Sequence, residues 1–289
     1  MASSSLDLSD RAVLAPLARL LSGVRQEAGD TPLLLVGAAA RDLLLVHVHG
    51  VEVQRATEDT DLALAVRSWE AFLRLREALI ASGGFTADDP PHRLWFGDQR
   101  LDIIPFGGVE RPDRSIAWPT EGAEVMSAAG LTEALATAVA VRLPGGVSID
   151  VAPLPALALL KIWAWTERRY TAPGKDASDI WMFLRHYAGA GNEDRLYGEE
   201  GEAALAAFGF DLDTAGAWLL GRDAREVLAH GPDPRRSLER LDAILRPEVD
   251  LDGALRLVAQ MPPGNRDRQL SLLAALCAGL FETSLRRPE

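Results

Sequence analysis

Short apolar runs alternate with helical repeats along the first half of the chain. Apolar residues recur every three or four positions over residues 10–28, which predicts a helix. Either Ser9 is its N-cap, or Pro16 kinks the helix or shifts its start. Residues 32–36 form a buried strand pattern that ends at Gly37, and residues 38–45 favour a helix. The remaining pattern predicts strands at 61–66, 92–96, 100–104, 138–143 and 147–151, and a helix at 69–81.

The second half of the chain reads as helical throughout. Hydrophobic residues at helical spacing predict helices at 156–169, 177–187, 202–208, 214–230, 234–245, 251–261 and 265–285. The chain therefore belongs to the α+β class, with a mixed sheet and flanking helices followed by an all-helical region. We place the division at an α/β domain of residues 1–153 and a helical domain of residues 154–289.

Composition narrows the possible functions. The net charge of −12 disfavours a general nucleic-acid coat protein, although a local basic surface remains possible on an acidic protein. Basic residues gather at 93–100, 168–175 and 235–246, where they either face solvent or pair with nearby carboxylates. The lone cysteine, Cys277, sits in an apolar helical run and is expected to be a core residue. No apolar stretch reaches membrane-spanning length and no signal peptide is visible, so we expect a cytoplasmic protein.

Three aspartates form the strongest chemical signal. Asp59 and Asp61 are two positions apart at the start of a predicted strand, so their side chains point to the same face. Asp102 lies between apolar residues of a later strand, where an unpaired carboxylate would be costly to bury. Three carboxylates on neighbouring strands can hold two divalent ions for phosphoryl transfer, and Mg²⁺, or alternatively Mn²⁺, suits such a site. The alternative is that these acids are structural.

The strand-to-helix turn at Gly37 and a later lysine complete the pattern. The glycine lets backbone N–H groups approach a phosphate at a helix N-terminus. Lys161 interrupts an apolar helix and either neutralises an anionic triphosphate or extends to water. Asp176 and Asp179 share one helix face, and they either cap the helix or hold Lys161 or Arg168, with capping the simpler account for Asp176.

These residues resemble the polymerase β-like nucleotidyltransferase superfamily, which includes the CCA-adding tRNA enzymes. The segment Val-Gly-Ala-Ala-Ala-Arg-Asp at residues 36–42 looks like the CCA-adding pattern of a glycine pair followed by Arg-Asp. The second glycine of the pair is replaced here by Ala38. The interval between Gly37 and Asp59 is also longer than usual, and it carries His47 and His49, which alternate on a possible strand and are expected to be ordinary surface histidines.

A closer resemblance is to the AbiEii/AbiGii toxin family of toxin–antitoxin and abortive-infection systems. It rests on four segments: Ala-Thr-Glu-Asp-Thr-Asp-Leu at 56–62, Leu-Asp-Ile-Ile-Pro-Phe-Gly at 101–107, Leu-Lys-Ile-Trp-Ala at 160–164 and Lys-Asp-Ala-Ser-Asp at 175–179. The resemblance implies a polymerase β-like fold in which the helices of residues 156–187 complete the nucleotide site.

The resemblance also implies the roles of individual residues. Asp59, Asp61 and Asp102 are expected to bind the metal ions and, with Lys161, to be catalytic. The residues expected to bind the nucleotide are Gly37, Ala38, Arg41, Lys175, Asp176 and Asp179. The expected reaction transfers a nucleoside monophosphate from an NTP to an acceptor hydroxyl, with the 3′ end of RNA or tRNA as the acceptor and an antitoxin protein as a partner. Nucleotidylation of a protein or small molecule, or a non-catalytic nucleotide-fold binding protein, is the alternative.

Overall fold

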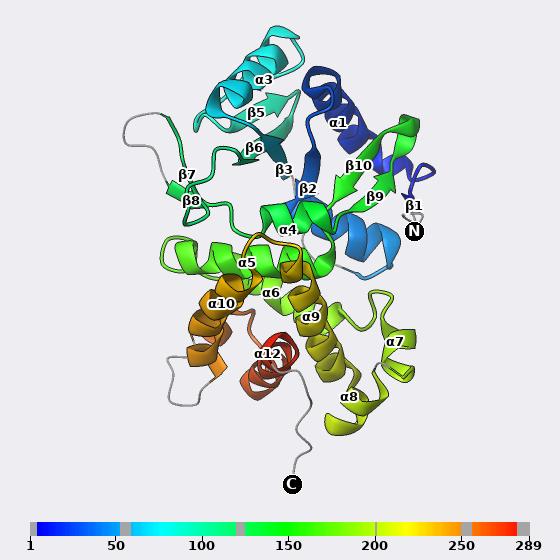
Figure 1. The fold of residues 1–289 in the computed structure, drawn as a ribbon. Coiled ribbons are helices and arrows are strands. Elements are labelled where there is room, and N and C mark those ends of the chain that lie inside the picture. Colours follow the sequence, from blue (N-terminus) through cyan, green and yellow to red (C-terminus); the bar gives the residue numbers. More distant parts are fainter. Residues whose placement is uncertain (1–4, 53–58, 120–124, 200, 250–255, 282–289) are drawn as a thin grey trace. The chain divides into compact units, whose positions relative to one another are not determined.

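The chain folds into two compact units, Met1–Pro153 and Leu154–Glu289, called unit 1 and unit 2 below. The computed structural model describes residues 5–52, 59–119, 125–199, 201–249 and 256–281 (Figure 1). The boundary between the two units falls where the sequence pattern changes from mixed strands and helices to helices alone. Each unit is described separately.

Unit 1 is built on a mixed β-sheet. Among its described residues, eight strands form this sheet in the order β1-β9-β10-β2-β3-β6-β5-β4 (Figure 1). A separate hairpin, β7–β8, lies outside it. The strand bounds are β1 Leu6–Asp7, β2 Leu33–Val36, β3 Asp59–Val66, β4 Thr86–Ala87, β5 Arg93–Phe96, β6 Gln99–Gly107, β7 Ser115–Ala117, β8 Val125–Ser127, β9 Val139–Arg142 and β10 Ser148–Val151.

The centre of the sheet is formed by β2, β3 and β6. Every residue of β2 is buried, as expected for an interior strand of continuous apolar residues. β3 runs antiparallel to β2 and parallel to β6. β5 and β6 form an antiparallel hairpin. β3 and β6 alternate in burial along most of their length, so one face of each strand remains partly accessible.

The helices of unit 1 flank this sheet. They are α1 (Ala15–Ala28), α2 (Gly37–Asp42), α3 (Trp69–Ala81) and α4 (Leu131–Ala136), with short 3₁₀ turns at Ala12–Leu14 and Pro144–Gly146. α1 and α3 pack against each other, and α4 contacts β6. Ser68 caps α3 by accepting a hydrogen bond from the Ala71 backbone.

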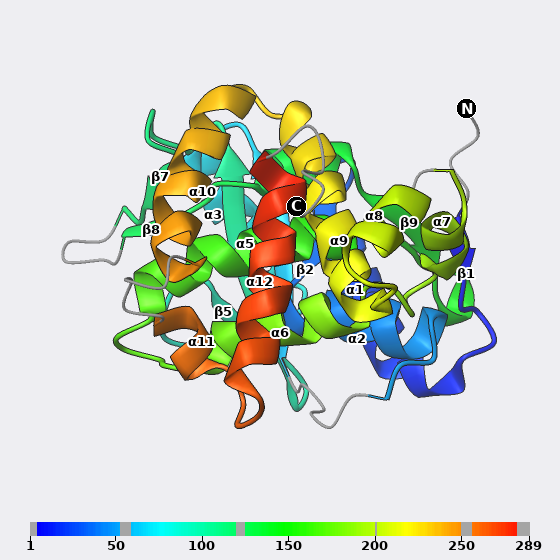
Figure 2. The same ribbon diagram turned by 90° about the horizontal axis from the view of Figure 1, so that it is seen from below.

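Unit 2 is entirely helical in its described part. Its helices are α5 (Leu154–Arg168), α6 (Lys175–His186), α7 (Glu193–Tyr197), α8 (Glu202–Ala207), α9 (Leu212–Ala229), α10 (Pro234–Val249), α11 (Arg256–Gln260) and α12 (Arg266–Phe281). Helices α9 and α12 lie side by side (Figure 2). A side chain at Gly221 would overlap the backbone of Leu276, and one at Gly279 would overlap the backbone of Trp218. Glycine therefore permits this close crossing.

Most predicted elements are confirmed, and three details are wrong. Ser9 does not cap the first helix: Pro16 fits only in the first turn, so α1 begins at Ala15 and Leu14 is its N-cap. His47 lies in a π-helical stretch, Leu43–Val48, that continues α2, so the histidines at 47 and 49 do not alternate on a strand. α4 ends at Ala136, because Val139 already pairs in β9.

The third error concerns Asp176. Gly174 occupies the N-cap of α6, and Asp176 lies inside the first turn, where it pairs with Arg168 and Lys161. The ion-pairing alternative is therefore the observed one. Cys277 is buried, as expected. Parts of the predicted helices at 251–261 and 265–285 lie outside the described residues.

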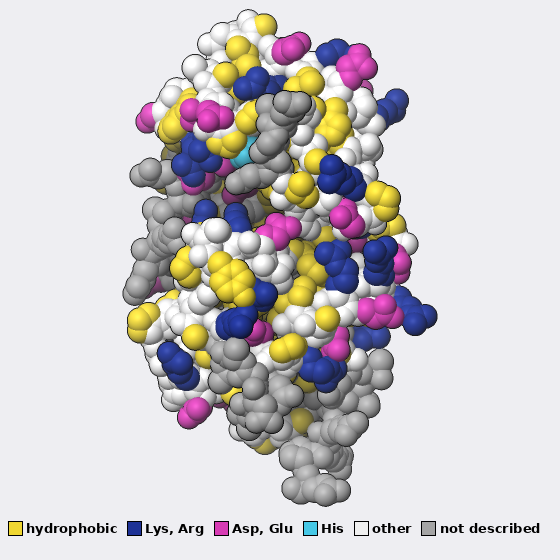
Figure 3. All heavy atoms as spheres, turned by 90° about the vertical axis from the view of Figure 1, so that its left-hand side faces the viewer, with side chains coloured by type: hydrophobic (Ala, Val, Ile, Leu, Met, Phe, Trp, Pro, Cys, Tyr) yellow, Lys and Arg dark blue, Asp and Glu magenta, His cyan; other side chains and the backbone are white. Residues whose placement is uncertain are grey.

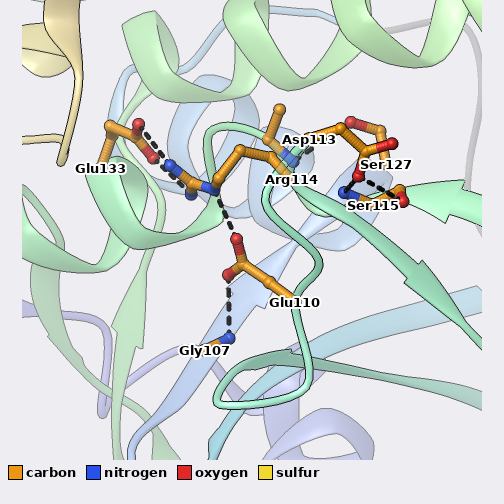
Figure 4. Close-up of polar contacts among 8 residues, drawn as sticks. Gly107, Glu110, Asp113, Arg114, Ser115, Ser127 and Glu133 are labelled. Atoms are coloured by element: carbon orange, nitrogen blue, oxygen red, sulfur yellow. Dashed lines mark hydrogen bonds and ion pairs between the residues drawn. The ribbon is translucent and has the colours of Figure 1, made fainter.

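A partly buried charge network holds the segment that follows β6 (Figure 4). The guanidinium of Arg114 pairs with Glu110 and, through two nitrogens at 3.2 Å, with both carboxylate oxygens of Glu133 on α4. Glu110 in turn accepts a hydrogen bond of 2.8 Å from the Gly107 backbone. Arg114 adopts a left-handed backbone conformation with φ of 66°. Such a conformation is uncommon for a side-chain-bearing residue, and these contacts retain it.

Candidate active site

The three predicted metal ligands lie on one face of the central sheet. In the parallel pairing of β3 with β6, Asp61 is directly opposite Asp102 and Asp59 is directly opposite Arg100. Paired residues of adjacent strands point to the same side of a sheet, and residues two apart on one strand do so as well. Asp59, Asp61 and Asp102 therefore share this side, which we call the acidic face.

The opposite sides of the same strands explain why the acids are oriented this way. Thr60 and Leu62 of β3 and Leu101 and Ile103 of β6 are buried in the core. Because side chains alternate along a strand, burying these residues directs the aspartates to the partly exposed side. A slip of one residue in the register would bury three carboxylates and expose an apolar row, so the hydrophobic pattern fixes the acidic face.

Gly37 lies directly beside one of the aspartates. It begins α2 at the end of β2, with a φ of 67°, a conformation that favours glycine. The Asp61 Oδ2 atom lies where a side chain at position 37 would begin. Glycine is therefore required here for two reasons: the backbone turn and the close approach of the Asp61 carboxylate.

Two arginines face the aspartates, and sequence analysis assigned them no role in the site. Arg93 on β5 donates from Nε to Asp102 Oδ1 at 2.9 Å and from Nη2 to Asp102 Oδ2 at 3.3 Å. Arg100 on β6 pairs with Asp59. The hydrogen bonds to Asp102 raise the pKa of the Arg93 guanidinium, so this group stays protonated. The basic run at 93–100 does contain both residues, but only the strand register shows which acids they meet.

The ligand chemistry of the acidic face suits a hard divalent cation. Carboxylate oxygens are the donors that Mg²⁺ takes, and three are available on adjacent strands. Among the described residues, however, no group of three or more acidic, histidine or cysteine side chains is gathered as a metal site. The carboxylates of Asp59 and Asp102 are instead directed to Arg100 and Arg93. The residues fit the ion in chemistry and in sheet face, provided that these two ion pairs open.

The other predicted nucleotide-binding residues of unit 1 lie in α2. Ala38 follows Gly37 and is half-buried. Arg41 is 2% exposed, and its Nη2 lies 2.6 Å from Asp42 Oδ1. The Arg41 side chain is thus buried beside an acid.

The predicted site residues of unit 2 form a second cluster, between α5 and α6. Lys161 Nζ lies 2.6 Å from Asp179 Oδ2 and 3.4 Å from Asp176 Oδ1. Arg168 also binds Asp176, through Nη2 at 2.7 Å. Lys161 is therefore not extended to water. Lys175 begins α6 and is exposed.

The sequence matches the family described as nucleotidyl transferase AbiEii toxin, type IV TA system, over residues 19–270. The chain belongs to this family. It is therefore an enzyme of the nucleotidyltransferase class, and its α+β fold, with a mixed sheet and a helical C-terminal region, agrees with the expectation from sequence. Enzymes of this class generally use an NTP and a divalent metal ion. Among curated proteins, none matches the chain.

Two solved structures are similar to part of the chain. One is the antibiotic-resistance factor ANT(2″)-Ia in solution, with 19% sequence identity, a TM-score of 0.37, and coverage of 67% of this chain and 91% of that chain. The other is ANT(2″)-Ia in complex with adenylyl-2″-tobramycin, with 20% identity, a TM-score of 0.36, and coverage of 67% and 97%. None of the helices formed by the described residues has the length and hydropathy that a membrane-spanning segment needs.

Proposed function

We propose that this protein is a magnesium-dependent nucleotidyltransferase that moves a nucleoside monophosphate from an NTP to the 3′ hydroxyl of an RNA, with tRNA as the favoured acceptor. It would act as the toxin of a toxin–antitoxin pair, restrained by an antitoxin protein. The observation that carries the proposal is the shared face of Asp59, Asp61 and Asp102 on β3 and β6, together with membership of the AbiEii family.

In the proposed reaction, the acceptor oxygen attacks the α-phosphorus of the NTP. A new P–O bond forms to the acceptor, the bond to the β-phosphate breaks, and pyrophosphate leaves. Bound divalent ions would stabilise the attacking and leaving oxygens. Asp59, Asp61 and Asp102 would hold these ions, and Asp102 would accept the proton of the acceptor hydroxyl.

The remaining residues support the proposal to different degrees. The turn at Gly37 and Ala38 offers backbone N–H groups to a phosphate. The burial of Arg41 beside Asp42 supports a role in holding α2 in place rather than in touching the nucleotide. Lys161, Lys175, Asp176 and Asp179 are assigned to nucleotide handling by family resemblance, and their ion pairs in unit 2 are the contacts that such a role would have to use.

A basic and aromatic surface of unit 2 supports an RNA acceptor. Tyr170 is 68% exposed, and the guanidiniums of Arg169 and Arg256 lie 5.1 Å and 5.9 Å from its ring centre. Within the described part of the chain, neither arginine forms an ion pair with a carboxylate. Guanidiniums held on an aromatic ring can bind phosphates and stack on bases. On the face drawn in Figure 3, Lys and Arg side chains lie beside hydrophobic ones.

The experiment uses each of the four NTPs, labelled at the α-phosphate, with Mg²⁺ and three acceptor pools: total RNA, a protein extract and small hydroxyl compounds. Three proteins are compared: wild type, Asp59→Asn/Asp61→Asn, and Asp98→Asn as a matched control. Asp98 is an exposed acid at the β5–β6 turn. Label should enter RNA with wild type and the control, and should be absent with the double variant.

Two results would contradict the proposal. If the protein labels no acceptor while a reference nucleotidyltransferase labels its own substrate, the protein lacks the proposed activity. If the double variant transfers label as well as wild type does, the acidic face is not the site of the reaction. Label found in protein or in a small molecule would show that the acceptor is not RNA.

A further inference from the structure

The acidic face contains its own cations. Three carboxylates, from Asp59, Asp61 and Asp102, share it with two guanidiniums, from Arg93 and Arg100. Both carboxylate oxygens of Asp102 accept hydrogen bonds in the bidentate contact with Arg93. These are the same oxygens that a divalent ion would need.

The backbone pairing of three strands builds this arrangement. Arg93 is directly opposite Asp102 in the antiparallel pair β5–β6, and Arg100 is directly opposite Asp59 in the parallel pair β3–β6. Directly opposed side chains on one sheet face are close neighbours. Each arginine therefore meets its aspartate without any adjustment of the backbone.

The two ion pairs are partly open to water. The side chains of Arg93 and Asp102 are 25% and 14% exposed, and those of Arg100 and Asp59 are 30% and 31% exposed. A partly exposed pair can separate because water compensates the charges, whereas a fully buried pair would leave an uncompensated charge. These pairs are therefore suited to exchange of partners.

We propose that Arg93 and Arg100 compete with divalent metal ions for Asp102 and Asp59, so that the free protein binds metal weakly and takes its ions together with a nucleoside triphosphate. Divalent ions replace the guanidiniums on the carboxylates. The displaced guanidiniums then need new anionic partners, and the triphosphate supplies them on the same face. Arg93 and Arg100 therefore bind the triphosphate in this scheme. The inference rests on the proposed function, because it assumes that the acidic face is the metal site.

The competition predicts a change in metal affinity with an unusual sign. Removing a cation that occupies the ligand should tighten metal binding, whereas removing a merely structural ion pair should weaken it or leave it unchanged. In the absence of nucleotide, Arg93→Gln and Arg100→Gln should each bind Mn²⁺ more tightly than wild type, on the order of tenfold for Arg93, whose contact is two-pronged. Arg93→Lys keeps the positive charge but cannot make the bidentate contact, so its Mn²⁺ affinity should lie between those of wild type and Arg93→Gln.

The experiment titrates Mn²⁺ into the full chain and follows free ion by electron paramagnetic resonance, without nucleotide and without a transfer assay. Arg74→Gln is the matched control, because Arg74 pairs with Glu70 on the exposed surface of α3. It should bind Mn²⁺ like wild type. The Asp59→Asn/Asp61→Asn double variant should not bind Mn²⁺, either alone or combined with any of the arginine substitutions. Circular dichroism melts confirm that each variant is folded, and Arg93→Lys serves if Arg93→Gln is not.

Affinity that is unchanged or weaker in folded arginine variants would overturn the competition. The proposed function fails separately, through absence of nucleotidyl transfer in wild type. Tighter Mn²⁺ binding by Arg93→Gln would support the competition even in that case, provided that the binding is lost with the aspartates.

Discussion

On the acidic face of unit 1, the side chains of Asp59 and Asp102 are 31% and 14% exposed, whereas Asp176 and Asp179 in unit 2 are 2% and 6% exposed. Both clusters pair aspartates with basic side chains. The accessible pairs can be exchanged for other cations, but the buried ones are costly to open. Similar residues thus form accessible ion pairs in one unit and a buried connection between α5 and α6 in the other.

The largest expected effect comes from changing an acid on the acidic face. Asp61→Asn removes the charge of a predicted metal ligand while keeping the size of the side chain. Nucleotidyl transfer should fall about 10³-fold or more, because the ions that stabilise the reacting oxygens lose a ligand. Thermal unfolding should shift by only a few degrees. A large loss of stability with full residual activity would place Asp61 with the structural acids.

The second cluster should respond in the opposite way. Lys161→Met leaves Asp176 and Asp179 without the lysine between them, and breaking a buried pair costs about 3–5 kcal/mol. Urea unfolding should report a loss near the lower end of this range, because Arg168 still neutralises Asp176. Lys161→Arg should recover part of it. An unchanged unfolding midpoint, combined with a raised KM for NTP, would show that Lys161 serves the nucleotide instead.

A smaller loss is expected at the turn before α2. In Gly37→Ala, the added methyl group overlaps the Asp61 carboxylate, and the left-handed backbone costs about 1–2 kcal/mol. Displacing a catalytic group by about 1 Å can reduce activity about 10²-fold. Transfer rates and unfolding should be compared with those of Gly29→Ala, where φ is also positive but no atom lies within 4 Å. Equal activity losses in both variants would remove the special role of the Gly37–Asp61 contact.

The smallest effect is expected at a surface ion pair. Arg74 and Glu70 are 65% and 77% exposed and lie one turn apart on α3. Arg74→Gln should change the free energy of unfolding by less than about 0.5 kcal/mol and leave transfer unaffected. A loss comparable to that of Lys161→Met would mean that burial does not separate the two kinds of ion pair.

Much of the fold follows from local patterns in the sequence. The hairpin β5–β6 and the helices α3 and α5 have continuous signals in hydrophobic spacing and turn residues. The two-residue strands β1 and β4 were not predicted, because they exist only through pairing with distant or neighbouring strands. The π-helical stretch was missed as well. Its bonds, such as that from the His49 backbone to Leu44, depend on how the turn is packed and not on residue preference.

The candidate site shows a similar limit. The alternation of Asp59 and Asp61 is a local property, so their common face could be predicted. The register that sets Asp102 beside Asp61 and Arg100 beside Asp59 is a property of paired strands far apart in sequence. The arginine partners could not be assigned without it.

The central claim is that the acidic face binds the metal ions of nucleotidyl transfer. The most direct measurement is anomalous diffraction from crystals of the full chain grown with Mn²⁺ and a non-hydrolysable NTP analogue. We expect an anomalous peak within about 2.0–2.3 Å of carboxylate oxygens from Asp61 and at least one of Asp59 and Asp102, with Arg93 turned away from Asp102. An ion bound elsewhere, with both arginine pairs intact, would contradict the account.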